Sequence, residues 1–225
     1  MINSEDLSQI FWQQVSHSTL AQFGTAEKTK EDVKALKRVL DPTDLILDLG
    51  CGWGRVTCVL AAEGYHVSGV DLSENLIIYA QKQATTLGLN IQFKIGSMLG
   101  IRYPDESFDK IVCLWGAFNH MLNPGDQISA LNEMHRVLKP GGLAFIEFGN
   151  GESKRYRSLM AAQGYGHQNR VIHLQYNEDQ PPNVVYIHDR GTLANIAGQS
   201  NFEKFRVKFQ NINRKRRTVT YLFKS

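Results

Sequence analysis

The sequence has few cysteines and no long apolar run. Its three cysteines, Cys51, Cys58 and Cys113, are an odd number set inside apolar segments, which argues against a disulfide framework. No stretch approaches the roughly 18 uninterrupted apolar residues that cross a bilayer, and the first residues lack the basic and apolar parts of a signal peptide. We therefore expect a cytoplasmic protein with no membrane partner.

The sequence also lacks internal repeats, low-complexity tracts and the ligand spacing of a zinc site. His167, His173 and His188 are scattered in or beside one segment, so we interpret them as surface or substrate-pocket residues and expect no metal. A chain of 225 residues with 42% apolar content is long enough for one substantial core and short for two. A single domain is therefore the working hypothesis.

Charge is distributed unevenly, although the net charge is only +3. Residues 1–150 hold 12 Lys and Arg against 17 Asp and Glu, whereas residues 151–225 hold 13 against 5. The basic run Arg214-Lys215-Arg216-Arg217 indicates either attraction of an anionic substrate or nucleic acid, or a solvated hairpin whose exposed residues happen to be basic. No aromatic stacking array accompanies these charges, so we do not expect a nucleic-acid partner.

Short β-rich apolar runs alternate with segments of helical period across the middle of the chain. This alternation predicts βαβ units and a doubly wound α/β fold with a mostly parallel sheet. The expected parallel strands are Leu45–Leu49, His66–Val70, Ile91–Ile95, Lys110–Leu114 and Leu143–Phe148. Apolar stripes predict helices at Val33, Leu36 and Leu40; at Val56, Val59 and Leu60; at Leu76, Ile77, Ala80 and Ala84; and at Ile128, Leu131 and Leu138.

Capping residues predict where the last of these helices begins and ends. Asn123 is an N-cap candidate followed by Pro124 at the first helical position, and Pro140-Gly141-Gly142 stops the helix before the fifth strand. Near the end of the chain, a short helix at Thr192–Gly198 precedes two β-like runs, Phe202–Phe209 and Thr218–Phe223. The two runs predict a hairpin.

A buried strand runs into a glycine-rich turn, Gly50-Cys51-Gly52-Trp53-Gly54, and a helix follows. Glycine permits positive φ and close approach of the backbone to a ligand, while the helix N-terminus presents free N–H groups. The next strand ends at Val70-Asp71, where a carboxylate can accept hydrogen bonds from two ribose hydroxyls. A dinucleotide site expects the longer pattern G-x-G-x-x-G, so the turn favours another nucleotide-like cofactor and a dehydrogenase stays an alternative.

Four motifs in this order resemble those of the class I S-adenosylmethionine-dependent methyltransferases, especially the small-molecule branch. Leu47–Gly54 is similar to the first motif, Val70-Asp71-Leu72-Ser73 to the acidic second, Phe108–Val112 to the fourth, and Leu138–Gly142 to the loop before strand five. The resemblance implies a Rossmann-like methyltransferase fold: a seven-stranded, mostly parallel sheet with an antiparallel C-terminal hairpin strand. It also implies a methyltransferase that uses S-adenosyl-L-methionine and releases S-adenosyl-L-homocysteine.

The resemblance carries roles to particular residues. Gly50, Cys51 and Gly52 are expected to pass under the methionine part of the cofactor, while Asp71 binds the ribose and Leu72 lies beside the adenine. Asp48 resembles the family's acidic residue that closes strand one. It either orients the glycine loop, receives the amino group through water, or is a buried carboxylate that caps the turn.

One position departs from the family pattern. After the third strand the family commonly has an acidic residue that contacts the adenine amino group, whereas this chain has Gly96-Ser97-Met98. Ser97 could hydrogen-bond there, and Met98 could pack on the ring or simply fill the core. Leu114, at the end of the fourth strand, completes the expected cofactor-binding set.

Methyl transfer is an in-line displacement at an activated carbon, so alignment and a dry pocket supply most of the catalysis. His120 is the candidate general base because an unperturbed pKa of about 6.5 suits proton acceptance at neutral pH; simple hydrogen bonding at a helix start is the alternative. Glu147 and Asn150 are further candidates on the same rim. We interpret Cys51 and Cys113 as packing residues rather than nucleophiles.

We expect methyl transfer to an unidentified small-molecule acceptor. The Asn/Asp/Ser-Pro-Pro-Tyr/Phe motif of family members that methylate exocyclic amines is absent, because this chain has Leu114-Trp115-Gly116-Ala117 there. The alternatives are an RNA or protein methyltransferase that uses the basic C-terminal region, and a non-catalytic S-adenosylmethionine-binding protein. A monomer and a homodimer both stay open.

We divide the single domain into four parts. These are a helical N-terminal cap (1–40), a cofactor-binding core (41–150), a substrate-side insertion (151–190), and a C-terminal helix with a β-hairpin (191–225). In the cap, Phe11, Trp12 and Phe23 either close over the cofactor or cover one face of the sheet. Selectivity for the acceptor is expected to reside in the cap and the insertion.

Overall fold

The structure, a computed structural model, describes most of the chain. The described residues are 10–13, 20–21, 24–162, 170–174, 183–212 and 215–225. Within them, seven strands form one sheet in the order β3-β2-β1-β4-β5-β9-β8. The strands are β1 (Leu45–Leu49), β2 (His66–Asp71), β3 (Gln92–Ile95), β4 (Phe108–Cys113), β5 (Leu138–Phe148), β8 (Lys204–Ile212) and β9 (Lys215–Phe223).

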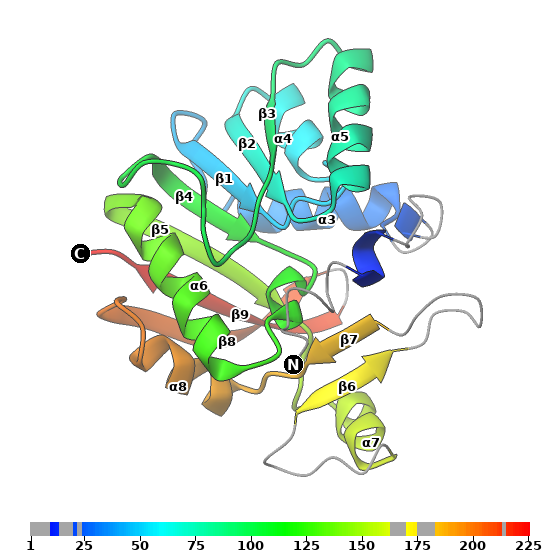
Figure 1. Cartoon of the computed structure of the whole chain (residues 1–225), viewed down its shortest axis with the longest axis vertical. Coiled ribbons are helices and arrows are strands. Elements are labelled where there is room, and N and C mark those ends of the chain that lie inside the picture. Colours follow the sequence, from blue (N-terminus) through cyan, green and yellow to red (C-terminus); the bar gives the residue numbers. More distant parts are fainter. Residues whose placement is uncertain (1–9, 14–19, 22–23, 163–169, 175–182, 213–214) are drawn as a thin grey trace.

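The large sheet is mostly parallel. The pairs β1–β2, β1–β4, β2–β3 and β4–β5 are parallel, whereas β9 runs antiparallel to both of its neighbours, β5 and β8. The strand order reverses between β1 and β4, which is typical of a doubly wound fold (Figure 1). The predicted α/β fold with seven strands and an antiparallel C-terminal hairpin strand is therefore confirmed.

Helices cover both faces of this sheet. They are α3 (Ala26–Leu36), α4 (Thr57–Ala62) and α5 (Glu74–Thr86) on one face, and α6 (Pro124–Val137) and α8 (Arg190–Gly198) on the other. Ile46 of β1 shares a buried apolar cluster with Leu36 and Leu60, while the next residue, Leu47, shares another cluster with Leu131. Successive side chains of a strand point to opposite faces, so β1 needs apolar residues toward both helical layers.

Two predicted boundaries near the fifth strand are wrong. Leu138, assigned to the helical stripe, instead begins β5 and pairs with Phe108, because α6 ends at Val137. Pro140-Gly141-Gly142 does not stop a helix but lies within β5, where Gly141 and Gly142 exchange backbone hydrogen bonds with Lys224. The tripeptide is instead associated with a break in the register between β4 and β5.

Helix starts depend on local caps. Asn123 caps α6 by accepting a hydrogen bond of 2.8 Å from the Asp126 N–H, and Pro124 occupies the first turn, as predicted. Leu40 and Val56, predicted on helices, lie just outside α3 and α4 but remain buried in the same cluster as those helices. No helix in the described part of the chain is long and apolar enough to cross a bilayer.

A small second sheet follows the fifth strand and was not predicted. Its strands β6 (Val171–Leu174) and β7 (Asn183–Tyr186) pair antiparallel. Helix α7 (Lys154–Ala162) packs on it through Tyr156, Leu159 and Met160. In Figure 1 this unit lies beside the end of the large sheet where β4 and β5 finish, and β7 contacts the 3-10 helix η1 (Ala117–His120). The unit therefore adds a wall at that end of the sheet.

Candidate active site

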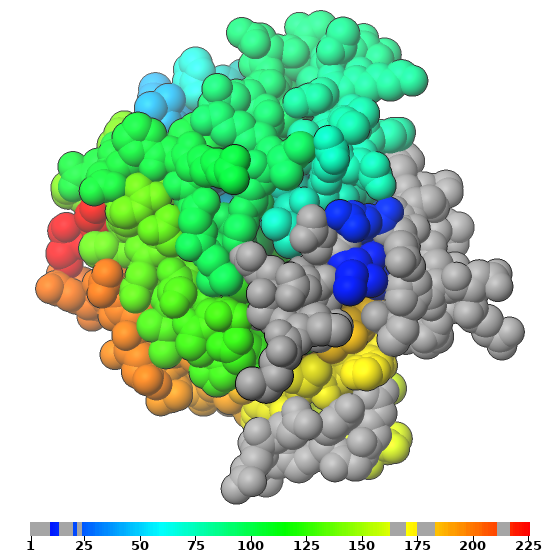
Figure 2. Space-filling model, viewed as in Figure 1, coloured from blue at the N-terminus to red at the C-terminus, as the bar shows by residue number. Residues whose placement is uncertain are grey.

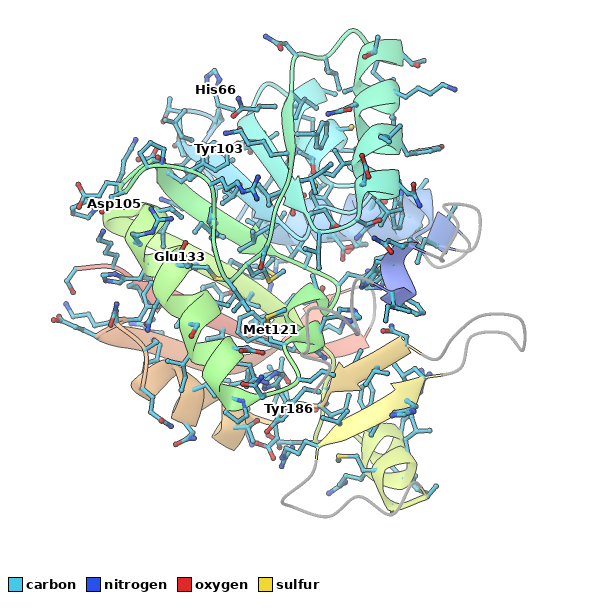
Figure 3. All side chains as sticks on the ribbon, in the orientation of Figure 1. His66, Tyr103, Asp105, Met121, Glu133 and Tyr186 are labelled. Carbon is cyan, nitrogen blue, oxygen red and sulfur yellow. The ribbon has the colours of Figure 1, made fainter. Side chains whose placement is uncertain are left out.

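The carboxyl ends of β1 and β4 meet at the point where the strand order reverses. Open α/β sheets bind ligands in the crevice outside these strand ends. The glycine-rich turn follows β1, and the segment from Leu114 to His120 follows β4. Figure 3 marks this end of the sheet by Met121, and the opposite end by His66 and Tyr103. The candidate site is therefore at the Met121 end.

The glycine-rich turn and the acidic end of β2 are directly bonded. The Gly50 and Cys51 N–H groups donate to the Val70 carbonyl at 2.7 and 3.1 Å. The Gly52 N–H donates to Oδ2 of Asp71 at 2.8 Å, and the Ser73 N–H donates to its Oδ1 at 2.9 Å. Asp71 thus joins the turn after β1 to the start of α5. The two features that the sequence assigned to one nucleoside are in contact.

Glycine is required at the first position of this turn. Gly50 has a φ of 77°, in the left-handed region that L residues rarely adopt. A Cβ added there would lie 2.5 Å from the Cβ of Ala117 and 3.1 Å from Cε of Met98. The turn therefore packs directly against the segment that follows β4, and a side chain at Gly50 would separate the two.

Asp48 is buried beneath the turn. Its side chain is 3% exposed, and its Oδ2 accepts a hydrogen bond of 2.6 Å from the Thr57 hydroxyl. Burial raises the pKa of Asp48 to about 6, although the bond from Thr57 and the charge of Arg55 oppose the shift. Burial also raises the pKa of Asp71, against the hydrogen bonds it accepts from backbone N–H groups. In both carboxyls, therefore, burial outweighs the hydrogen bonds that favour the charged form.

One cavity brings together all the residues predicted to bind the cofactor and the candidate base His120. Its lining includes Asp48, Gly50, Cys51, Gly52, Asp71, Leu72, Ser97, Met98, Leu114 and His120. It also includes residues to which the sequence assigned no role: Trp53, Arg55, Gly96, Trp115, Ala117 and Met121. Trp115 and Ala117 could have been found from their place directly after the fourth strand, since that edge carries the site.

The described residues 10–13 of the N-terminal segment reach this cavity. Trp12 lines the cavity, and its carbonyl accepts a hydrogen bond of 3.1 Å from the Ser73 hydroxyl. The Gln13 carbonyl accepts another, of 3.0 Å, from the Asn75 side chain. Figure 2 shows these blue residues beside the teal surface at the start of α5. Phe11 is buried next to Trp12, while Phe23 lies outside the described residues.

Trp115 has an unusual backbone at the centre of the site. Its φ is 55°, which is uncommon for a bulky residue and is kept only where the surroundings impose it. The buried Glu147 accepts a hydrogen bond of 2.9 Å from its N–H. Its ring lies 5.5 Å from the ring of Trp53, and Lys28 and Arg55 stand over it at 4.8 and 5.3 Å. These contacts hold the indole of Trp115 in place, where it forms part of the cavity wall.

His120 is buried and neutral. Its side chain is 6% exposed and packs edge-on against Trp12, with ring centroids 5.2 Å apart. Burial lowers the pKa of His120 to about 4, although a hydrogen bond to the Val184 backbone opposes the shift. Among the described residues its Nδ1 has no partner. The imidazole therefore offers a free lone pair at neutral pH, with a weaker basicity than the sequence suggested.

A second cavity adjoins the first. Trp12, Trp115 and His120 line both cavities, so these three residues mark where the two meet. Much of the remaining lining comes from η1, α7, the β6–β7 sheet and β9: Asn119, Tyr156, Leu174, Asn183, Val185 and Arg217. Leu20, Gly116, Gly149 and Ile187 complete it from outside these elements. Tyr186, labelled in Figure 3, shows where β7 lies relative to Met121. The small second sheet thus supplies a wall of this cavity.

The other candidates from the sequence lie elsewhere. Glu147 and Asn150 are not among the lining residues of either cavity; Glu147 binds Trp115 instead, and Asn150 accepts a hydrogen bond from the Glu152 N–H at 3.1 Å. His188 is buried among aromatic rings, His173 is exposed on β6, and His167 lies outside the described residues.

The three cysteines lie in the buried interior. Cys51, Cys58 and Cys113 are buried free thiols, and burial raises the pKa of each. Their high pKa supports packing rather than nucleophilic roles. Within the described ranges, no group of three or more His, Cys, Asp or Glu side chains is placed to hold a metal ion.

The fold and the site define a Rossmann-like α/β protein with a cavity at the glycine-rich turn, and known proteins match part of the chain. Residues 46–142 match the family model described as a methyltransferase domain. A probable methyltransferase of Aspergillus luteorubrus, ltbC, is 35% identical over 126 residues, which are 52% of this chain and 44% of that protein. The demethylmenaquinone methyltransferase of Listeria monocytogenes serotype 4a (strain HCC23) is 33% identical over 135 residues, which are 58% of this chain and 55% of that protein.

The chain thus spans about half the length of the curated relatives it matches. Among solved structures, a SAM-dependent methyltransferase of Methanosarcina mazei has a TM-score of 0.71 and 26% identity, over 84% of this chain and 96% of that chain. These matches support a class I S-adenosylmethionine-dependent methyltransferase, which is the family that the four motifs predicted. They likewise support the predicted enzyme class and cofactor.

Proposed function

We propose that this protein transfers the methyl group of S-adenosylmethionine to a small-molecule acceptor. The observation that carries the proposal is the pair of adjoining cavities, one at the glycine-rich turn and Asp71 and the other under the β6–β7 sheet, which meet at Trp12, Trp115 and His120. One cavity suits a nucleoside, and the other suits a compact apolar molecule. Their shared wall is where a methyl group would pass.

The residues of the first cavity fit the cofactor. Gly50 packs against Ala117 and Met98 with no room for a Cβ, and the glycine itself lines the cavity, so its backbone can lie next to a ligand there. The Asp71 carboxylate, held by two backbone N–H groups, can accept hydrogen bonds from ribose hydroxyls. Asp48 supplies a buried negative charge for the amino or sulfonium group. Leu72, Met98 and Leu114 give apolar contacts for the adenine side, and Ser97 gives a hydroxyl there.

When bound, S-adenosylmethionine supplies a methyl group on a sulfonium sulfur, and in-line attack by the acceptor atom forms the new bond as the carbon–sulfur bond breaks. Trp12 and Trp115 exclude water from the meeting point of the cavities. His120 holds the acceptor by the lone pair on Nδ1 and takes the departing proton there. A base with a pKa of about 4 suffices for an acceptor hydroxyl, because a methylated hydroxyl is a strong acid until it loses its proton.

The basic C-terminal region supports a small-molecule acceptor more than a nucleic acid. Arg217, the last residue of the basic run, is only 16% exposed and pairs with the buried Glu147. Its charge is therefore directed into the molecule rather than displayed as part of a phosphate-binding surface. We also propose that the chain acts as one domain, with the N-terminal segment and residues 151–190 selecting the acceptor. The three buried free thiols support a reducing, cytoplasmic setting.

Two measurements test the proposal. Calorimetry with S-adenosylmethionine, S-adenosylhomocysteine and NAD is expected to give binding of the first two alone, and preferential binding of NAD would remove the assignment. Incubation with methyl-labelled S-adenosylmethionine and a metabolite mixture is expected to label a small molecule. Label found instead in RNA or protein, or RNA binding that persists at physiological salt, would favour the macromolecular alternative.

A further inference from the structure

We propose that the acceptor carries an anionic group, such as a carboxylate, on an apolar body, and that Arg217 binds this group in the second cavity. The inference rests on the proposed function, because it names the class of molecule that the second cavity takes. Arg217 is then a specificity-determining residue at the end of the cavity, while His120 stands where the cavity meets the cofactor site.

Arg217 is oriented for this role by a buried partner. It lies on β9 next to Thr218, which pairs with Phe148 at the end of β5. Its Nε binds Oε1 of Glu147, whose Oε2 accepts the Trp115 N–H. The side chain of Arg217 also lines the second cavity. A guanidinium held by Nε keeps the paired donors that match a carboxylate.

The charge around the cavity also favours an anion. Arg217 is the one formally charged side chain among the described residues that line it, since burial keeps His120 neutral. Next to the cavity, Lys28, Arg55 and Arg217 form ion pairs with Asp32 and Glu147, and Arg55 also acts on Asp48. Arg217 is the member of this group that lines the cavity. An ammonium group in the cavity would be repelled by the guanidinium of Arg217, whereas an anion would pair with it.

The rest of the cavity defines the body of the acceptor. Its walls are mainly apolar or aromatic, from Trp12, Trp115, Leu174 and Val185 to Ile187, so a flat apolar molecule can fill it. Two buried acceptor atoms line it without a described partner: Oδ1 of Asn119 and Nδ1 of His120. Each can receive a hydrogen bond from a hydroxyl of the acceptor. A hydroxyl therefore belongs at the cofactor end and the anion at Arg217.

The methionine part of the cofactor also carries a carboxylate, which is an alternative partner for these basic residues. The two cavities separate the candidates, since Arg55 lines the first cavity but not the second, and Arg217 the second but not the first. We therefore assign Arg217 to the acceptor. A variant at Arg217 should change acceptor binding without changing cofactor binding.

The test uses the full chain saturated with S-adenosylhomocysteine and three probes of similar shape: anionic benzoate, neutral benzamide and cationic benzylamine. Titrations followed by ligand-observed NMR give a dissociation constant for each probe. We expect benzoate to bind at least tenfold more tightly than benzamide, and benzylamine to bind least. Equal binding of benzoate and benzamide, or tighter binding of benzylamine, would overturn the inference.

Variants assign the preference to one residue. Arg217→Gln is expected to reduce benzoate binding to the benzamide level, whereas Arg206→Gln, the same change at an exposed residue of β8, should keep the full preference. Arg217→Lys retains a charge beside Glu147, which guards against loss of the fold, and should keep part of the preference. Loss of the preference in Arg206→Gln, or its persistence in folded Arg217→Gln, would contradict the assignment.

Cofactor binding separates the two proposals. Failure of the wild-type chain to bind S-adenosylhomocysteine would overturn the proposed function and, with it, this inference. Cofactor binding without a preference for benzoate would overturn the inference alone. Weakened S-adenosylhomocysteine binding in Arg217→Gln, equal to its loss of benzoate binding, would move Arg217 to the cofactor and also contradict the assignment.

Discussion

The substitution Gly50→Ala tests whether the glycine-rich turn has to lie against the segment after β4. Gly50 has a φ of 77°, and an added Cβ would stand 2.5 Å from the Cβ of Ala117. Gly88 offers a matched control, because its φ of 64° is also positive but nothing lies within 4 Å of an added Cβ. The two variants therefore share the backbone strain and differ in the clash.

The magnitudes follow from these two effects. A left-handed conformation costs an L residue roughly 1–2 kcal/mol, so Gly88→Ala should lose about that much free energy of unfolding. Overpacking adds roughly 1–3 kcal/mol in a close-packed region, which brings the loss for Gly50→Ala to about 2–5 kcal/mol. Because the clash displaces the turn bonded to Asp71, only this variant should also bind S-adenosylhomocysteine more weakly.

Urea denaturation gives the free energies of unfolding, and calorimetry gives the affinity for S-adenosylhomocysteine. Gly88→Ala is expected to keep the wild-type affinity, and Gly50→Ala to lose about tenfold or more, which corresponds to about 1.4 kcal/mol. Equal destabilisation of the two variants together with unchanged affinity in Gly50→Ala would refute the view that the turn is shaped for close approach to a ligand.

Three other residues give predictions from charge and burial. Asp71→Asn should weaken S-adenosylhomocysteine binding by about 1–3 kcal/mol, because it removes charge-assisted hydrogen bonds; unchanged affinity by calorimetry would contradict the ribose contact. Burial raises the pKa of Asp48 to about 6, so its negative charge is lost between pH 7.5 and pH 5.5. The wild type should therefore bind S-adenosylmethionine more weakly at pH 5.5 than at pH 7.5. The affinity of Asp48→Asn should depend less on pH. Burial lowers the pKa of His188 to about 3, so the unfolded chain takes up a proton near pH 6.5 while the folded chain does not. Between pH 6.5 and pH 3, His188 should therefore lower the free energy of unfolding by about 1.4 kcal/mol for each pH unit. In His188→Phe the new ring can pack on Phe118 and Phe148. Urea denaturation of this variant should show a smaller loss of free energy of unfolding between pH 7 and pH 5 than the wild type shows. An acid sensitivity of the variant equal to that of the wild type would exclude His188 as its source.

The sequence predicts the parts of the site that depend on local pattern. The turn at Gly50 and the carboxylate at Asp71 follow apolar strands, and a parallel sheet brings such strand ends to one edge, so their contact follows from topology. The caps at Asn123 and Pro124 are likewise local, because each acts within one helical turn. These features need no knowledge of distant packing.

Other features depend on contacts between distant parts of the chain. The low pKa of His120 results from burial, to which Trp12 contributes, and is opposed by a hydrogen bond to the Val184 backbone; neither residue is near His120 in sequence. The positive φ of Trp115 is imposed by contacts that include the bond to Glu147, whereas a positive φ is usually expected at glycine. The β6–β7 sheet escaped prediction because a strand as short as Val171–Leu174 gives too few alternations to recognise.

The most direct test of the central claim is a crystal structure of the protein with S-adenosylhomocysteine. The account predicts density for the nucleoside in the first cavity, with the ribose hydroxyls hydrogen-bonded to Asp71 and the amino acid part over Gly50 and Gly52. Density for the ligand anywhere else, or a ribose that Asp71 does not reach, would contradict it.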